Sequence, residues 1–366
     1  MKDGKNILIC PLEWGLGHAA RMIPVARKLL ELNSNVFIGA GEKHLALFRV
    51  EMPDLKLISF PGFSPGYSRY IPQYIFMLLK TPVLLYHIIA EHYRLKKIVR
   101  DYKIDIVISD NRFGLWNRSI TSVYVTHMLR IPLPKQLRLL ESIGMMLHRY
   151  VIRNYSMCFI PDLAGDLNIS GRLSHGVKMP GNARYIGILS RFTSGNTEQI
   201  NPFDYPHNTV ILSGPEPQRS ILKQKLTKAL SQKEPPTVML EGKPGKDQSA
   251  GKKGNIIFYN HLPSGKMTAL IESGNYIISR SGYTTIMDLI ALNRTALLIP
   301  TPGQTEQEYL AEYLAEKGWF ETIAQDAISD KIILPAKDKT WPGEMMEESK
   351  ILLDNALSEL LEEHNQ

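Results

Sequence analysis

Small and hydroxyl-bearing residues follow an apolar run in the second half of the chain, in a pattern suited to anion binding. Tyr276-Ile277-Ile278 is typical of a strand, and Ser281 and Gly282 then lead to Thr284 and Thr285 at a helix start. The first NH groups of a helix have no internal partner, and the helix dipole favours negative charge there. The turn is therefore predicted to bind phosphate.

Asp288 lies one turn into this expected helix. A carboxylate at that position could accept hydrogen bonds from a sugar diol such as a ribose. The alternative is an ordinary strand–helix turn with Asp288 in solvent.

A second glycine turn, Gly15-Leu16-Gly17-His18, follows the first expected strand, residues 6–10. It lacks the third glycine of the dinucleotide fingerprint. His18 could act as a general base on a hydroxyl, since the pKa of histidine is near the working pH. It could equally bind phosphate or only cap the helix.

Two further candidates stand where buried strands end. Asp110 follows the strand at residues 104–108, and open α/β sheets bind ligands at the carboxyl ends of their strands. It is a second candidate base, or it only orients its loop. His127 follows the strand at residues 122–126 and could contact an acceptor or be a satisfied rim residue.

Strands alternate with helices throughout the 366 residues, which predicts an α/β chain of two Rossmann-like domains. We expect a first domain over residues 1–190, a linker over 191–206 and a second domain over 207–344. A helix at 345–366 would pack back on the first domain. Two cysteines exclude a disulfide framework and a four-cysteine zinc site, and no Asp-x-Asp ends a strand, so no obligatory metal or other cofactor is expected.

The stretch SRSGYTTIMDLIALNRTALLIP, with the Gln/Glu-rich helix start after it, resembles the donor-site signature of MurG-type (family 28) glycosyltransferases. The resemblance implies the GT-B fold, in which two Rossmann-like domains face a cleft. It also implies transfer of a sugar from a nucleotide diphosphate. The Gly-Leu-Gly-His turn resembles the first glycine loop of that family.

The resemblance assigns residues around this cleft. The donor residues are Gly17, Arg191 for the diphosphate, Ser213, Gly214, Arg219, Leu262 for the base, Ser281, Gly282, Thr284, Thr285, Asp288, Gln304, Gln307 and Glu308. His18 and Asp110 are the candidate catalytic residues, and Trp14, Arg112 and His127 are assigned to the acceptor. Pro215 and Pro217 remove two NH donors from the phosphate loop, and Glu308 replaces a glutamine, which leaves the sugar open.

Residues 70–100 are rich in apolar and aromatic side chains and end in the basic cluster Arg94, Lys96, Lys97 and Arg100. We expect two helices broken near Pro82. They would either rest on a membrane or a lipid tail, or cover the sheet as ordinary core. Residues 1–160 hold 22 Lys and Arg against 11 Asp and Glu, which favours an anionic partner. No nucleic-acid module is visible.

The predicted function is transfer of a hexose or N-acetylhexosamine from a UDP-sugar to an acceptor, lipid-linked or part of the cell envelope. The predicted location is cytoplasmic, with peripheral contact to the inner face of the plasma membrane, since the start MKDGKNILIC has no signal-peptide apolar region. A nucleotide-sugar epimerase of the same fold and a non-catalytic nucleotide-sugar-binding subunit are the alternatives.

Overall fold

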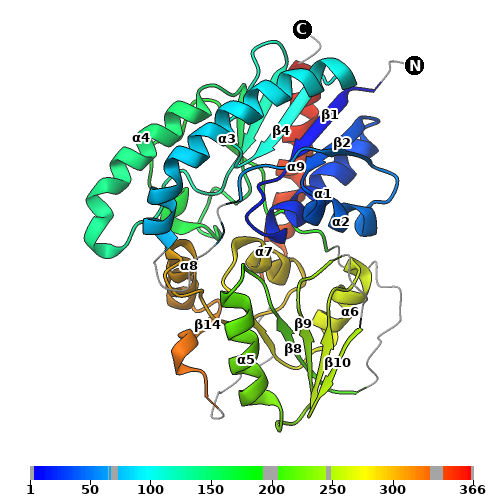
Figure 1. Cartoon of the computed structure of the whole chain (residues 1–366), viewed down its shortest axis with the longest axis vertical. Helices are drawn as coiled ribbons and strands as arrows, with labels where there is room; N and C mark the ends of the chain where they lie inside the picture. Colours follow the sequence, from blue (N-terminus) through cyan, green and yellow to red (C-terminus); the bar gives the residue numbers. More distant parts are fainter. Residues whose placement is uncertain are drawn as a thin grey trace.

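The computed structural model describes residues 4–64, 66, 73–192, 205–244, 249–329 and 341–363. Two sheets, each flanked by helices, form an upper and a lower domain (Figure 1). Most of the linker predicted at 191–206 lies outside the described residues.

The first sheet has the strand order β3-β2-β1-β4-β5-β6-β7, and its neighbouring strands are all parallel over the described residues. Its strands are β1 (Asn6–Cys10), β2 (Asn35–Ala40), β3 (Lys56–Ser59), β4 (Ile106–Asp110), β5 (Thr121–Val125), β6 (Met157–Ile160) and β7 (Ala183–Tyr185). The central strands are continuous apolar runs because helices cover both faces of the sheet. The strand order reverses between β1 and β4, so the loops after these two strands diverge and leave room for a ligand.

The second sheet has the order β10-β11-β9-β8-β12-β13-β14, and only its β10–β11 pair is antiparallel among the described strands. Its strands are β8 (Asn208–Ile211), β9 (Thr237–Leu240), β10 (Ser249–Lys253), β11 (Ile256–Tyr259), β12 (Ile277–Ser279), β13 (Leu297–Leu298) and β14 (Glu321–Thr322). Its order reverses between β8 and β12. The α/β GT-B architecture expected from the sequence is confirmed.

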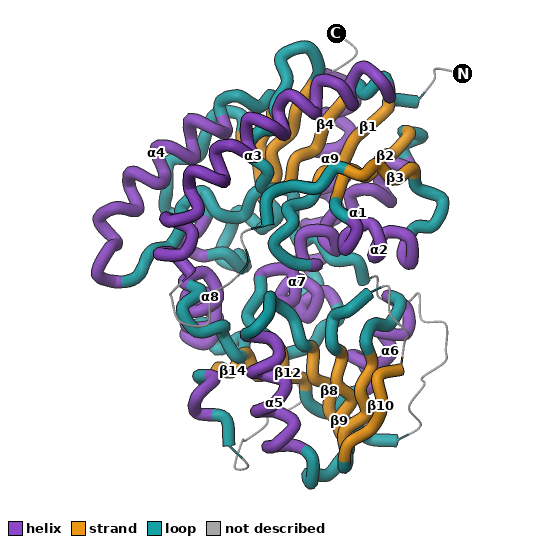
Figure 2. The backbone as a smooth tube through the Cα atoms, in the orientation of Figure 1, coloured by secondary structure: helices purple, strands orange, loops and turns teal. Residues whose placement is uncertain are grey.

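Helices surround both sheets (Figure 2). They are α1 (Leu16–Glu31), α2 (Glu42–Glu51), α3 (Gln73–Tyr102), η1 (Lys135–Leu140), α4 (Glu141–Ile152), η2 (Gly171–Leu173), α5 (Gln218–Leu230), α6 (Ser264–Ser273), α7 (Tyr283–Ala291), α8 (Thr305–Glu316), η3 (Gln325–Ala327) and α9 (Glu344–Glu363). The last helix, α9, runs from the lower domain back along the upper one (Figure 1). There Ser349 Oγ accepts a bond from the NH of Ile188 at 2.9 Å, and Lys28 pairs with Asp354 at 2.9 Å.

Residues 73–102 form one helix, α3, rather than two helices broken near Pro82. Proline in a helix removes one backbone hydrogen bond but need not end the helix. The second half of α3 covers the sheet, with Leu95 fully buried. The first half extends beyond the sheet beside α4 (Figure 1), and Leu78 is 72% exposed, so the expectation of ordinary core is wrong for this part.

Candidate functional site

The two glycine turns singled out in the sequence meet across the space between the domains. The turn after β1 precedes α1, and the turn after β12 precedes α7. Thr284 Oγ1 donates to the carbonyl of Gly17 at 3.1 Å, and a Cβ on Gly17 would lie 3.0 Å from that hydroxyl. Gly17 therefore allows close approach of the two helix starts. The hydroxyl of Thr284 therefore donates to the other domain and not to a ligand.

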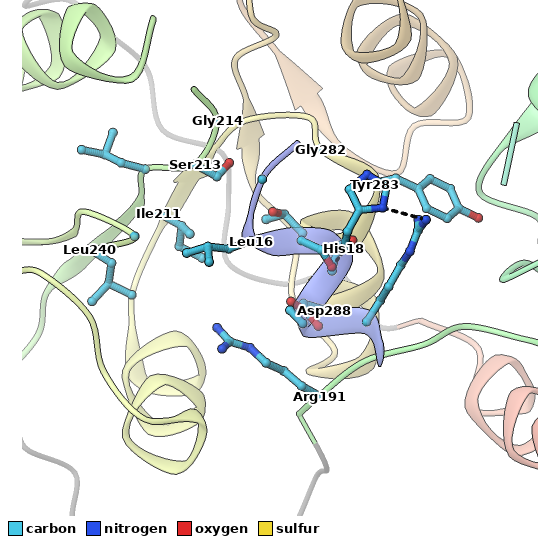
Figure 3. Close-up of a pocket in the computed structure, with 18 of the residues that line it drawn as sticks. Leu16, His18, Arg191, Ile211, Ser213, Gly214, Leu240, Gly282, Tyr283 and Asp288 are labelled. Atoms are coloured by element: carbon cyan, nitrogen blue, oxygen red, sulfur yellow. Dashed lines mark hydrogen bonds between the residues drawn. The ribbon is translucent and has the colours of Figure 1, made fainter. Parts of the chain in front are cut away.

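The interdomain cleft between these turns is lined from both sheets, at the loops where each strand order reverses. Figure 3 shows His18, Tyr283 and Asp288 on one side and Ser213 and Gly214 on the other. The lining holds the cations Arg21, Lys43, Arg191 and Arg219, and the acids Asp288 and Glu306. These cations can bind a diphosphate, although Arg21, Arg191 and Arg219 are also paired with Asp110, Glu51 and Glu216.

His18 and Asp110 form a pair at the N-domain end of the cleft. Nδ1 of His18 lies 3.0 Å from Oδ2 of Asp110. The Asp110 side chain is fully buried, while that of His18 is 19% exposed. Asp110 therefore lies behind His18 and cannot itself reach a substrate, which corrects its prediction as an alternative base.

Arg21 supports this pair from one turn further along α1. Its Nε donates to Oδ2 of Asp110 at 3.0 Å, and its Nη2 bonds Oδ1. Burial alone would raise the pKa of Asp110, but the charges of Arg21 and His18 lower that pKa to about 2. Asp110 is thus a carboxylate at any working pH.

The hydrogen bonds around His18 determine the tautomer of its neutral ring. Nη2 of Arg21 also lies 3.0 Å from Nδ1 of His18, so Nδ1 can accept from Arg21 or donate to Asp110, not both. We place the proton on Nδ1, because two lone pairs would otherwise face each other between His18 and Asp110. Nε2 of His18 is then free to accept a proton.

His127 links the domains beside this pair. Nη1 of Arg21 lies 3.1 Å from Nδ1 of His127, and Nε2 of His127 lies 2.8 Å from Oε1 of Glu306 on α8. Its ring stacks on Tyr283 with centroids 4.0 Å apart. Since Arg21 is a donor only, the His127 proton is on Nε2 and points to Glu306. His127 is only 2% exposed. Its side chain therefore serves as a contact between the domains, and not as the acceptor contact that was predicted.

Glu306 is a site residue that the sequence analysis did not single out. It lines the cleft, and the charges of His127, His18 and Arg21 lower its pKa although burial acts in the opposite direction. The only sequence signal was its place next to Gln307 at a helix start. Lys43, on the first turn of α2, also lines the cleft and was missed, because nothing in its local sequence indicates a site.

Asp288 and Arg191 lie together on the cleft floor (Figure 3). Oδ1 of Asp288 accepts a bond from Ser190 Oγ at 2.7 Å. Burial raises the pKa of Asp288 to about 6, against the opposing charge of Arg191. Nη1 of Arg191 lies 3.4 Å from Glu51, so its guanidinium is shared with a carboxylate of the N-domain.

The loop after β8 still lines the cleft, although Pro215 and Pro217 remove two of its NH donors. Gly214 has φ 95°, and Ser213 and Gly214 line the cleft. Arg219 lines it too, but its guanidinium donates to Glu216 at 2.7 Å and to two main-chain carbonyls. Leu262, Gly282, Thr285, Gln304 and Gln307 also line the cleft.

Two predicted donor contacts are used elsewhere in the structure. The buried Ser281 hydroxyl donates to the carbonyl of Gln307 at 2.8 Å. Glu308 is exposed outside the cleft lining, and its Oε1 accepts from the NH of Gly303 at 2.8 Å. Gln307 lies at the cleft, but its Oε1 accepts from the NH of Thr301 at 2.9 Å, which leaves its amide NH2 for a ligand.

A second space, the apolar cavity, adjoins the cleft and measures about 370 Å³. It lies between α3, α4 and the start of α8, and it shares Trp14, His18, Gln304 and Glu306 with the cleft. Arg112 lines it but is 2% exposed, donates to Glu91 at 3.0 Å and binds the carbonyls of Gly39 and Phe60. Its predicted acceptor role is therefore corrected to an internal ion pair.

Within the described part of the chain, no group of three or more His, Cys, Asp or Glu is arranged to hold a metal ion. Both cysteines are buried and unpaired.

Comparison with known proteins agrees with this geometry. Residues 241–349 match the glycosyltransferase family 28 C-terminal domain. An uncharacterized glycosyltransferase of Methanosarcina acetivorans is 23% identical over 338 residues, covering 87% of this chain and 86% of the relative. A UDP-N-acetylglucosamine–N-acetylmuramyl-(pentapeptide) pyrophosphoryl-undecaprenol N-acetylglucosamine transferase of Bacillus thuringiensis is 31% identical over 101 residues, which is 27% of this chain and 28% of that protein.

Among solved structures, the glycosyltransferase SnogD from Streptomyces nogalater superposes with a TM-score of 0.59, at 16% identity, over 99% of this chain and 96% of its own. That likeness is one of fold. Together with the family 28 C-terminal domain and the two-domain cleft, it supports a glycosyltransferase of the GT-B fold whose second domain is similar to that of MurG-type enzymes.

Proposed function

We propose that this glycosyltransferase moves a hexose or N-acetylhexosamine from a UDP-sugar to the hydroxyl of a membrane-borne acceptor. The observation that carries the proposal is the His18–Asp110 pair, placed where the cationic cleft meets the apolar cavity. A base is useful only if donor and acceptor both reach it, and His18 lines both spaces.

The donor would bind the side of the cleft that the second domain forms. The start of α7 offers free NH groups to the diphosphate, with Gly214 and the nearby cations on the opposite side. Asp288 would accept bonds from the ribose hydroxyls, and Gln304 and Gln307 would bind the sugar. No step requires a metal, because these groups carry the opposing charge.

The reaction would take place between the bound donor and the acceptor hydroxyl, at His18. Nε2 of His18 takes the proton of the acceptor hydroxyl, and that oxygen forms a bond to the anomeric carbon. The bond from this carbon to the diphosphate breaks, and UDP leaves with the electron pair. Asp110 stabilises the imidazolium that forms.

The membrane assignment rests on the helical arm, which we define as α3 residues 74–89 with η1 and α4. Apolar side chains cover its outside, among them Leu78, Leu79, Tyr86, Leu139, Leu147 and Tyr150. Soluble monomers rarely expose so many large apolar groups together. By length and composition alone, Tyr74–Tyr102 could cross a membrane, but its second half packs on the sheet. We therefore propose peripheral contact at the cytoplasmic face.

The proposal is tested with a panel of nucleotide sugars, each incubated with the protein with and without membrane extract. Release of UDP that depends on the extract is the expected result. Interconversion of the donor without transfer would instead indicate an epimerase, and donor binding without turnover would indicate a silent subunit.

A further inference from the structure

One face of α2 is turned toward the second domain. Lys43, Leu47 and Glu51 are spaced four residues apart, so their side chains follow one another along one side of this helix. Lys43 and Leu47 line the interdomain cleft, and Glu51 contacts the second domain directly. In Figure 1, α2 lies at the lower edge of the upper domain, above α6. This helix of the N-domain therefore forms part of one side of the cleft.

Glu51 fixes the carboxyl-terminal end of α2 to the second domain. Its Oε1 accepts the NH of Ser264, the first residue of α6, at 3.1 Å and lies 3.4 Å from Nη1 of Arg191. The side chain of Glu51 is only 3% exposed. A carboxylate at a helix start is stabilised by the unpaired NH groups and by the helix dipole. Glu51 thus holds α2 against the start of α6, which carries the cleft residues Met267 and Ile271.

Glu13 fixes the amino-terminal end of α2 within its own domain. Its Oε1 accepts the NH of Gly41, the residue before α2, at 2.5 Å. A Cβ on Gly41 would lie only 3.0 Å from Oε2 of Glu13, so a glycine at this position allows the carboxylate to approach the helix start. Because the first turn of α2 is held in this way, Lys43 has a defined place at the cleft.

Lys43 faces Arg219 of α5 across the cleft. Both line it, from different domains, and burial together with the charge of Arg219 lowers the pKa of Lys43, while Glu13 and Glu216 act in the opposite direction. Two cations that approach each other from opposite sides repel, and an anion between them removes that repulsion. The loop that leads to α5 lines the cleft with Gly214, close to where the donor diphosphate would bind. That diphosphate is an anion of the required kind.

Leu47 adds apolar surface one helical turn from Lys43, on the side toward α6. The second domain lines the cleft with further apolar side chains, which are Ile211, Leu212, Leu240, Leu262, Met267 and Ile271. Figure 3 shows Ile211 and Leu240 at the end of the cleft away from Tyr283, where α7 starts. Apolar side chains can cover the flat faces of a nucleobase, whereas the diphosphate requires NH groups and cations.

We propose that α2 binds the donor nucleotide from the N-domain, with Leu47 packed on the nucleobase and Lys43 paired with the diphosphate, while Glu51 holds the helix on α6. The proposal rests on the proposed transfer from a UDP-sugar, and it assigns nucleotide binding to both domains. A donor bound in this way contacts the two sides of the cleft at its base and at its phosphates.

Calorimetry with UDP and with ribose 5-diphosphate, which lacks the base, isolates the contact of Leu47. Leu47→Ala should raise the dissociation constant of UDP at least about tenfold and that of ribose 5-diphosphate less than about twofold, because only UDP loses apolar contact. Leu47→Met keeps the side-chain volume and should bind UDP normally. Val50→Ala, 43% exposed on the same helix and outside the cleft lining, is the matched control.

Calorimetry with UDP and with uridine isolates the contact of Lys43. Lys43→Met should raise the dissociation constant of UDP at least about tenfold and that of uridine less than about twofold, because uridine has no phosphate to lose its cation. Lys43→Arg should restore most of the UDP affinity. Arg49→Met removes a charge from the same helix outside the cleft lining and should bind UDP normally. Lys43 is exposed, so this arm stands even if Leu47→Ala fails to fold.

The outcomes separate the role of α2 from the proposed function. Unchanged UDP affinity in both Leu47→Ala and Lys43→Met, with UDP bound by the unmodified protein, would refute the role of α2 while the transferase function stands. Equal losses for UDP and ribose 5-diphosphate in Leu47→Ala would contradict the contact with the base. Absence of UDP binding by the unmodified protein would contradict the proposed function itself.

Discussion

At the scale of single residues, the proposed mechanism makes Asp110 a positioning residue and not the base. It is fully buried, charged and bonded to both Arg21 and His18. Asp110→Asn keeps the shape but allows the wrong His18 tautomer. We expect kcat to fall by at least about a hundredfold with the dissociation constant of UDP unchanged.

Steady-state kinetics with calorimetry of UDP binding checks this, and thermal melting shows whether the variant folds. A kcat close to that of the unmodified protein would show that the tautomer of His18 does not matter.

Asp288 predicts a pH dependence of donor binding. Its pKa is raised to about 6, so the side chain loses its proton as the pH rises through that value. The carboxylate accepts ribose hydroxyl bonds better than the acid does, so the dissociation constant of UDP should fall between pH 5 and 7. Calorimetry across this range tests it, and Asp288→Asn should give weaker binding with a flatter profile.

The same raised pKa has an opposite effect on stability. Between the unfolded value of 3.8 and about 6, the folded protein binds more protons than the unfolded chain. The free energy of unfolding therefore decreases as the pH rises through this window. At pH 7.5, Asp288→Asn should melt no lower than the unmodified protein. A much lower melting temperature would show that Asp288 is needed for the fold.

Gly17, His18 and Asp288 were predicted at the cleft because they lie in or just after turns at the ends of parallel strands, and Gln307 was predicted there from the resemblance to family 28. Ser281 and Glu308 were predicted to bind the donor but bond to Gln307 and Gly303 instead, since the direction of a side chain depends on its partner in the fold. Glu306 was missed for the same reason, because its partner His127 is 179 residues away.

At the scale of elements, α8 connects the domains. His127 binds Glu306 at its start, Tyr309 accepts from the NH of Arg172 at 2.8 Å, and Tyr313 donates to Asn168 at 2.9 Å. Arg21 contacts both His127 and His18, so we expect a ligand that binds α8 to affect the position of His18.

Glu306→Ala tests this coupling. It leaves His127 without its acceptor, so we expect a larger radius of gyration by small-angle X-ray scattering and a kcat/KM about tenfold lower. Glu316→Ala, at an exposed position of the same helix outside the cleft lining, is the control for helix stability. An unchanged radius of gyration together with unchanged kinetics would show that the His127–Glu306 contact has no role in closure.

The helices show where prediction from sequence fails. Periodicity predicted the positions of α1 and α9, because each has one apolar face against a sheet or a neighbouring helix. Pro82 predicted a break in α3, but the helix continues through it, with Thr81 Oγ1 donating to the carbonyl of Met77 at 3.1 Å. Local sequence also does not show that half of α3 extends beyond its domain.

At the scale of the molecule, the excess of positive charge and the exposed apolar surface of the helical arm both belong to the first half of the chain. The first 160 residues hold 22 cations and 11 acids, and the helical arm belongs to this half. We expect sedimentation with phosphatidylglycerol vesicles that weakens as salt rises and that Leu78→Glu with Leu139→Glu abolishes. Ile351→Glu should sediment normally. Binding that neither salt nor the arm variants change would exclude this surface.

In each domain, the loops at the point where the strand order reverses form one side of the cleft. That arrangement was predictable from the alternation of strands and helices. The joining of the two walls through Gly17–Thr284 and His127–Glu306 was not, because it depends on how the domains sit together.

The central claim is that His18 removes the proton of the acceptor hydroxyl. It is tested most directly by acceptor-dependent UDP release from His18→Ala, measured beside UDP binding by calorimetry. The account predicts release slower by about 10²–10⁴-fold with UDP affinity within a factor of about two. Release at the unmodified rate would contradict it.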